Sequence, residues 1–167
     1  MVRLKIRRRH RLRHKEISAM SSAIDAALGT KSFTESETVD RAEAPEFDVL
    51  FVDGALLGLV IDDEPFLTIR GILEYGASKR FVTVDMGAVR FVANGADVMG
   101  PGIVDADETI TEGDLVWVRD EKNLRPLAVG KAIASAEGLK AKPKGKAVIS
   151  LHYVGDKLWS LDEDGEQ

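Results

Sequence analysis

In the first half of the chain, the spacing of apolar residues changes from the period of a strand to that of a helix. Val2, Leu4 and Ile6 alternate with cationic residues, which predicts a half-buried strand followed by an arginine cluster. Residues 30–46 are rich in Ser, Thr and Glu and predict a loop or an edge strand. Between these segments, residues 16–28 carry an apolar stripe at helical spacing, which Gly29 ends: Ile17, Met20, Ile24, Ala27 and Leu28.

The next segment predicts a hairpin and a short helix. The apolar runs at 47–52 and 56–61 flank Asp53-Gly54, whose residues both tolerate positive φ. Asp62-Asp63-Glu64 precedes a proline and predicts a solvated turn rather than a metal cluster. We expect Thr68 to cap a short helix that carries Ile69, Ile72 and Leu73, and Gly76-Ala77-Ser78 to form a domain boundary.

A strand, a short helix and a glycine-rich turn are predicted between residues 81 and 102. Phe81–Val84 has the composition of a strand, and Asp85 can cap the helix that follows. Met86, Val89 and Val92 recur at helical spacing, and Gly95 can supply the left-handed residue after the helix. A second strand at 97–99 then ends at Gly-Pro-Gly. Such a turn exposes backbone amides and leaves room for a ligand backbone.

The remaining residues predict a small barrel. We expect an acidic loop at 104–109, a lysine-rich loop at 140–146, and four strands. The strands are expected at Leu115–Val118, Pro126–Ala134 (with Gly130 at a bulge), Ala147–Val154 and Leu158–Leu161. Together with the two earlier strands they give five or six short strands separated by turns, a spacing typical of a small barrel.

Charge is distributed unevenly along the 167 residues, whose net charge is −5. Residues 1–15 contain eight Lys or Arg and no acid, whereas residues 16–78 contain three cations and thirteen acids. A basic arm on an acidic body predicts contact with a polyanion at one end, although a solvated arm has the same composition. There is no cysteine, no long apolar segment and no apolar run behind the charged N-terminus, so we expect a cytoplasmic protein.

No catalytic or metal-binding constellation is evident. G-x-S-x-G, H-E-x-x-H and Walker motifs are absent. His10 and His14 have helical ligand spacing, but neighbouring arginines would repel a cation, and Asp105 with Asp107 is a weak metal motif. His152 lies in an apolar strand and is expected to be a satisfied interior residue. We therefore expect neither an enzyme nor a cofactor.

Four segments resemble those of known proteins. The segment GADVMGPG at 95–102 resembles the Gly-Ala-x-hydrophobic-x-x-Pro-Gly turn of PUA domains, RNA-binding modules named after pseudouridine synthases and archaeosine transglycosylases. The tail KGKAV at 144–148 and LHYVGDKLW at 151–159 resembles the end of the malignant T-cell-amplified-sequence proteins and their archaeal relatives. The opening at Arg8–Ile17 and the segment Pro65–Tyr75 are similar to the pre-PUA domain of those archaeal proteins.

The resemblance implies a fold and a function. The fold would be an α+β N-terminal pre-PUA domain at residues 1–76, a small mixed β-barrel PUA domain at 77–162 and an acidic tail at 163–167. The protein would be non-catalytic and would hold structured RNA, the tRNA acceptor end or the small ribosomal subunit, in translation initiation or recycling. A ribosomal subunit or a second translation factor would be its partner. An accessory subunit that delivers a tRNA-modifying enzyme to its RNA remains the alternative.

The same resemblance implies the RNA-contacting residues. The turn would contribute Gly95, Ala96, Met99 and Gly102, and the phosphate contacts would be Lys79, Arg80, Arg90 and Lys146. From the charge pattern, the arm residues Arg7, Arg8, Arg9 and Arg11 are further phosphate candidates. The alternative is that the glycines serve barrel geometry and the cations are solvated. Trp117 and Trp159 could stack on bases, but we expect both to pack inside the protein.

Overall fold

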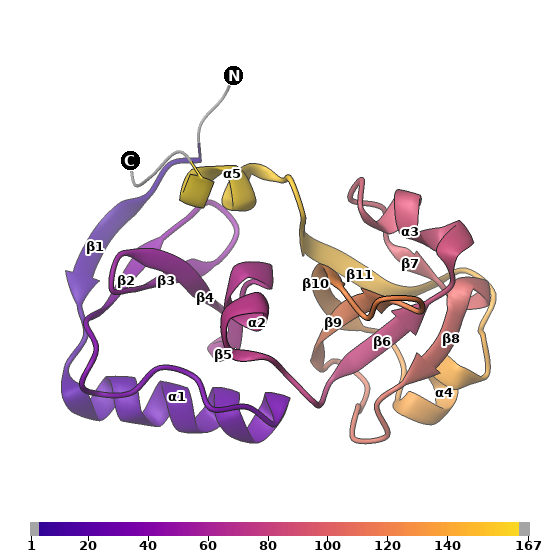
Figure 1. Cartoon of the computed structure of the whole chain (residues 1–167), viewed down its shortest axis with the longest axis horizontal. Helices are drawn as coiled ribbons and strands as arrows, with labels where there is room; N and C mark the ends of the chain where they lie inside the picture. The colour runs from indigo at the N-terminus through magenta and orange to yellow at the C-terminus, as the bar shows by residue number, and fades with distance from the viewer. Residues whose placement is uncertain (1–3, 164–167) are drawn as a thin grey trace. The chain divides into compact units, whose positions relative to one another are not determined.

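The computed structural model describes residues 4–163. Contacts divide the chain into two compact units (Figure 1). Unit 1 contains the residues up to Ala77 and those from Lys157 onward, and unit 2 is Ser78–Asp156. The chain passes from unit 1 to unit 2 between Ala77 and Ser78, and unit 2 ends at Asp156. The chain enters unit 2 once and returns to unit 1 for its last segment.

Unit 1 contains one antiparallel sheet of five strands in the order β1-β2-β3-β4-β5. The strands are β1 (Arg7–Arg11), β2 (Val39–Glu43), β3 (Asp48–Val52), β4 (Ala55–Ile61) and β5 (Glu64–Leu67). The predicted hairpin is present as β3 and β4, because Asp53 (φ 47°) and Gly54 (φ 88°) both adopt the left-handed conformation that a two-residue turn requires. Strand β2 pairs on both sides and is not an edge strand.

Three helices belong to unit 1: α1 (His14–Leu28), α2 (Ile69–Tyr75) and α5 (Lys157–Glu163). Helix α1 buries Ile17, Ile24 and Leu28, and its C-cap Gly29 has φ 61°. Helix α2 begins as predicted, with the Thr68 hydroxyl accepting a hydrogen bond from the Gly71 N–H at 3.1 Å. Leu73, expected in its apolar stripe, is 54% exposed.

The first strand lies later in the chain than predicted. The alternation at residues 2–6 predicts a strand there, but β1 begins at Arg7, and Val2 lies outside the described residues. Strand β1 pairs with β2, which places Arg11 opposite Asp40 and Arg7 opposite Glu43. Strand β1 is therefore specified by backbone pairing with β2 and by opposite charges across the two strands, and not by alternation of apolar and cationic residues.

Unit 2 contains a mixed sheet of six strands in the order β7-β11-β10-β9-β6-β8. The strands are β6 (Phe81–Val84), β7 (Val98–Met99), β8 (Ile103–Ala106), β9 (Leu115–Asp120), β10 (Pro126–Ala132) and β11 (Lys146–Tyr153). Strand β6 pairs parallel with β9 and antiparallel with β8. The predicted irregularity at Gly130 is present as a register shift between β10 and β11. Helices α3 (Met86–Val92) and α4 (Ala136–Lys140) accompany the sheet.

Three predictions for this half of the chain are wrong. The sheet is not a closed barrel, because β7 and β8 end the strand order without pairing to each other among the described residues. The expected acidic loop contains β8, in which Ile103 and Ala106 are buried and Asp105 pairs with Thr83. The expected strand at 158–161 is part of helix α5, where Leu158 and Leu161 are buried three residues apart, a spacing that suits a helix face.

Candidate nucleic-acid interface

Helix α3 is held at its N-terminus by two carboxylates. The Asp85 side chain accepts a hydrogen bond from the Ala88 N–H at 2.9 Å, as its cap position predicts. Glu121, from the turn after β9, accepts a hydrogen bond from the Met86 N–H at 2.8 Å. After the helix, Gly95 has φ 96° and the chain reverses into β7. The short helix and the following turn are thus fixed on one side of unit 2.

An open groove of about 540 Å³ lies between α3 and the Gly-Pro-Gly turn. Phe91 and Met99 stand at it with 55% and 48% of their surface exposed, which is unusual for large apolar side chains. The residues that line the groove come from α3, from β7 and its flanking turns, and from β11: Asp85, Gly87, Ala88, Phe91, Val92, Ala96, Asp97, Met99, Pro101, Gly102 and Lys146.

Asp97 lines this groove and is held there by two partners. One of its carboxylate oxygens accepts a hydrogen bond from the Ser150 N–H at 2.8 Å, and the other lies 3.1 Å from the Lys146 Nζ. The backbone hydrogen bond from Ser150, and then the Lys146 ammonium, lower the pKa of Asp97. The Lys146 side chain is 60% exposed, so its ammonium reaches both the carboxylate and solvent.

The glycines near the turn have different roles. A Cβ atom on Gly95 would lie 2.7 Å from the Tyr153 ring, and one on Gly100 would lie 1.7 Å from the Pro143 carbonyl oxygen. Gly102 lines the groove, where a Cβ atom would meet Ala88 at 3.0 Å. Among the turn residues proposed for RNA, Ala96, Met99 and Gly102 therefore lie at the groove, whereas Gly95 is occupied by internal packing.

The phosphate candidates of unit 2 differ in whether their side chains are exposed or held by other residues. Arg80 is a structural residue: its Nη1 donates to the Leu115 carbonyl at 3.1 Å and its Nε lies 3.6 Å from Asp114. The Lys79 side chain is exposed, and only its backbone carbonyl is used, by the Trp117 indole N–H at 2.8 Å. Arg90 is exposed on α3 with its guanidinium 4.9 Å from the Phe91 ring centroid.

Most arm arginines are paired within unit 1. Arg9 and Arg11 both contact Asp40, and Arg8 lies 3.3 Å from Glu43. Although burial acts to raise the pKa of Asp40, hydrogen bonds from Arg11 and Arg9 lower it. The Arg9 guanidinium also lies 4.0 Å from the Phe51 ring centroid. Arg7 is exposed and forms no ion pair with a described residue.

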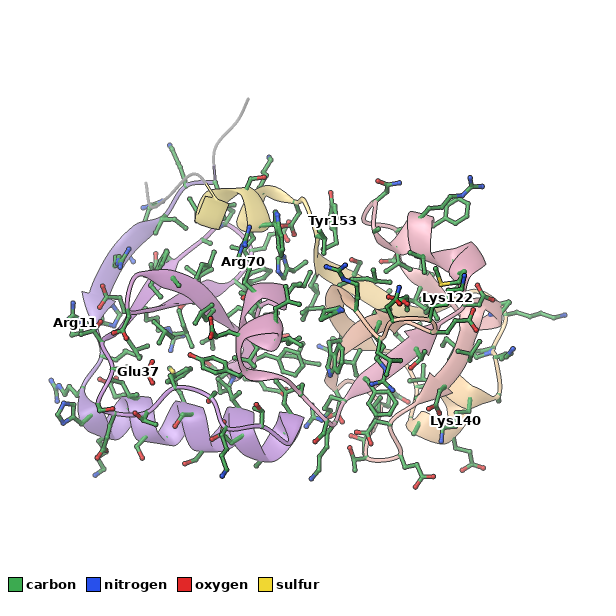
Figure 2. All side chains as sticks on the ribbon, viewed as in Figure 1. Arg11, Glu37, Arg70, Lys122, Lys140 and Tyr153 are labelled. Atoms are coloured by element: carbon green, nitrogen blue, oxygen red, sulfur yellow. The ribbon has the colours of Figure 1, made fainter. Side chains whose placement is uncertain are left out.

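Residues weighed for other roles have partners within the protein. His152 is 1% exposed and its Nδ1 lies 2.8 Å from the Asp156 carboxylate, which also accepts the Tyr153 N–H. Trp117 is 3% exposed, as expected. Trp159 is half-buried, and the guanidinium of Arg70, which is labelled in Figure 2, lies 3.6 Å from the centroid of its indole ring. Lys140 lies within 4 Å of Asp105 and Glu108.

The described residues offer neither a metal site nor a membrane-spanning helix. Residues 4–163 contain no group of three His, Asp or Glu side chains arranged to hold a metal ion. No helix in the same range is both long and apolar enough to cross a membrane.

Sequence reasoning missed Phe91 and Pro101 as groove residues. Phe91 lies outside the stripe of Met86, Val89 and Val92, and a large apolar residue on the polar side of a predicted helix is the signal that identifies it. Pro101 is predicted only as part of the glycine-rich turn that ends a strand, not as a contact residue. The signal for both is that neither belongs to the apolar residues predicted to form the core.

Comparisons with known proteins identify the domain that contains this groove. The family model of the PUA domain matches residues 80–154, which include the groove. An uncharacterized protein of Methanocaldococcus jannaschii is 37% identical over 95% of this chain and 99% of its own length. The Saccharomyces cerevisiae protein called translation machinery-associated protein 20 is 30% identical over 66% of this chain. The rat protein called malignant T-cell-amplified sequence 1 is 30% identical over 68%. The chain covers 64% and 65% of these two relatives.

Solved structures extend the likeness to nearly the whole chain. A hypothetical protein of Pyrococcus horikoshii has a TM-score of 0.81 at 33% identity, with 93% of this chain and 99% of that chain covered. A conserved PUA-domain protein of Thermoplasma acidophilum has a TM-score of 0.75 at 25% identity, with the same coverage. This chain therefore belongs to the PUA-domain proteins, in one family with the Methanocaldococcus jannaschii protein, and it resembles translation machinery-associated protein 20 and the malignant T-cell-amplified-sequence proteins.

Proposed function

We propose that this protein is a non-catalytic RNA-binding protein that holds structured RNA during translation initiation or recycling. The RNA would be the acceptor end of a tRNA or a segment of the small ribosomal subunit. The observation that carries the proposal is the groove between α3 and the Gly-Pro-Gly turn. In this proposal residues 1–76 act as a pre-PUA domain, which presents the PUA domain to its partner.

The chemistry of the groove suits unpaired RNA. Phe91 and Met99 offer exposed apolar surface on which a base can stack, because every base has a π face. Lys146 stands beside them with an exposed ammonium for a phosphate. Ala96 and Gly102 are small, so a sugar-phosphate backbone can approach the main chain closely. Single-stranded ends and loops present bases in this accessible form.

The translation role rests on relatives. One relative carries the name translation machinery-associated protein, and the matched residues span most of this chain. The RNA-binding step rests on the groove, and the translation step rests on the names of these relatives. Separate measurements therefore have to test the two steps.

Crosslinking in cell extract, followed by sequencing of the attached RNA, tests both steps. Phe91→Ala is the groove variant. Ile133→Ala removes an apolar side chain of similar exposure, 45%, that does not line the groove, and serves as the matched control. We expect tRNA 3′ ends or small-subunit ribosomal RNA to be enriched with the wild type and Ile133→Ala, and to be lost with Phe91→Ala.

Other outcomes revise the proposal in distinct ways. Enrichment of one tRNA subset together with a modifying enzyme would replace the translation role by that of an accessory subunit. Enrichment that is equal in the three proteins would place the RNA site away from the groove. Absence of RNA from the wild type would refute RNA binding.

A further inference from the structure

A second groove lies in unit 1, where the end of β1 meets the start of α1. It has a volume of about 700 Å³ and is open to solvent. The residues that line it are His10, Arg11, Arg13, Lys15, Glu16 and Ala19. The first four of these carry cationic or titratable nitrogen groups. Figure 2 shows Arg11 at this end of unit 1. The groove was not expected from the sequence, because the four basic residues come from a strand, a connection and a helix.

The acids near this groove are used elsewhere. A Glu16 carboxylate oxygen accepts a hydrogen bond from the Arg13 N–H at 3.0 Å and so caps the helix. Asp40 contacts Arg9 and Arg11. Arg13 and Lys15 are exposed, and neither forms a salt bridge with any residue in the range 4–163. The groove therefore carries excess positive charge on a unit whose other segments are acidic.

The position of these cations has no structural benefit for α1. The N-terminus of a helix carries a partial positive charge, so cations in the cap and first turn are unfavourable by several tenths of a kcal/mol. Arg13 is the N-cap residue and Lys15 lies in the first turn of this 15-residue helix. Three sources of positive potential thus meet at the groove: Arg13, Lys15 and the helix end. The Glu16 carboxylate is stabilised by that arrangement, and an external anion would be stabilised in the same way.

We propose that this groove, here called the basic groove, binds the phosphate backbone of the RNA whose unpaired segment occupies the groove at α3. This inference rests on the proposed function. Arg13 would contact phosphate oxygens through its planar guanidinium, and Lys15 would contribute a point charge. The groups offered by the basic groove are cations that suit phosphate oxygens, and phosphate contacts carry no base sequence information. Of the four arm arginines predicted as phosphate contacts, only Arg11 lines it.

The test measures affinity for a defined RNA as a function of salt. The probe is a fluorescein-labelled RNA hairpin with a single-stranded 3′ extension, and binding is followed by fluorescence anisotropy. The variant is Arg13→Gln with Lys15→Gln. Its matched control is Lys31→Gln with Lys157→Gln, which removes the same charge from exposed positions of unit 1 outside the basic groove. Phe91→Ala is measured on the same probe to monitor the groove at α3.

We expect the double variant to bind roughly fivefold more weakly at low salt, and its log–log salt slope to flatten by about 1 per lost contact. The control should bind within about twofold of wild type, because distant exposed charges are screened. Phe91→Ala should lose affinity and retain the salt slope. Unfolding temperature should be unchanged or raised in the double variant, since it removes two cations from a helix N-terminus.

The failures can be told apart. If the double variant keeps the wild-type affinity and slope while Phe91→Ala weakens binding, the basic groove is not an RNA site and the proposed function stands. An equal loss in the Lys31 and Lys157 control would also overturn the inference, because general charge would explain it. If the double variant loses binding of poly-L-glutamate but not of RNA, the basic groove recognises an acidic peptide instead. A wild type that does not bind the hairpin refutes both proposals.

Discussion

Gly95 packs against the ring of Tyr153, so that a Cβ atom at position 95 would lie 2.7 Å from Tyr153 Cε1. Its φ of 96° adds a second constraint. We predict that Gly95→Ala lowers the free energy of unfolding by about 2–3 kcal/mol, from backbone strain and overpacking together. Urea denaturation measures this loss.

Gly113→Ala separates the two causes. Gly113 has φ 89°, but a Cβ atom there would meet nothing within 4 Å. This control should lose only about 1 kcal/mol, from the backbone conformation alone. Equal losses at the two positions would show that the Tyr153 ring moves aside freely.

Asp120 should make stability depend on acid pH. It is 4% exposed, and its carboxylate accepts the Asn123 N–H at 2.6 Å and the Arg125 N–H at 3.1 Å. Burial acts to raise the pKa of Asp120, but the backbone hydrogen bonds prevail and lower it. Because the folded pKa lies below the unfolded value of about 3.9, the stabilisation is present above about pH 4 and is lost as pH falls through the folded pKa.

The variant Asp120→Asn tests this linkage. We predict a loss of about 1–3 kcal/mol at pH 7, because the amide replaces an acceptor by a buried donor. The difference from wild type should shrink below about pH 4 in urea titrations at several pH values. Asp63→Asn, at an exposed turn, should behave like wild type throughout. A difference that persists at low pH would assign the effect to packing.

Lys79 and Arg80 are neighbours whose substitution should have opposite effects on stability and on the salt dependence of RNA binding. The Arg80 side chain is 17% exposed and holds the Leu115 carbonyl, so Arg80→Gln should cost about 1–2 kcal/mol of stability. Its effect on the salt dependence of RNA binding should be negligible. Lys79→Gln should leave stability within about 0.5 kcal/mol and flatten the salt slope. The reverse pattern would return Arg80 to the phosphate candidates.

Arg70 should stabilise the last helix. Its guanidinium covers Trp159, and its Nη2 donates to the Trp159 carbonyl at 3.4 Å. We predict that Arg70→Gln lowers the free energy of unfolding by about 1 kcal/mol and shifts tryptophan emission to longer wavelength. Arg90→Gln is the control, because Arg90 covers Phe91 at an exposed site. An unchanged emission spectrum in Arg70→Gln would contradict the stacking.

Local signals predicted the elements whose ends are chemically marked. Asp53-Gly54 specified the hairpin because both residues adopt positive φ, and the caps at Thr68 and Asp85 specified two helix starts. Leu158 and Leu161 were ambiguous, because a run of four residues is too short to distinguish strand from helix by period. Strand β8 was missed because Asp105 suggested a loop, although its backbone pairs with β6.

Only part of the candidate site could be predicted from the sequence, because local signals do not identify partners that are distant in the chain. The glycine turn is local in sequence, and Ala96, Met99 and Gly102 line the groove as the resemblance implied. Gly95, Arg80 and Arg9 are committed to Tyr153, Leu115 and Asp40, partners that lie 31 to 58 positions away in the chain and are recorded only by the fold. Charge alone cannot identify which cations remain available to a ligand.

The return of the chain to unit 1 at Lys157 has a consequence for the order in which the units form during synthesis. Unit 2 is contiguous in sequence, so all of its residues have been joined before the first residue of α5 is added. Unit 1 starts first but lacks Leu158, Trp159 and Leu161, which are translated after the whole of unit 2. The sequence of unit 2 is therefore complete before that of unit 1, although unit 1 begins the chain.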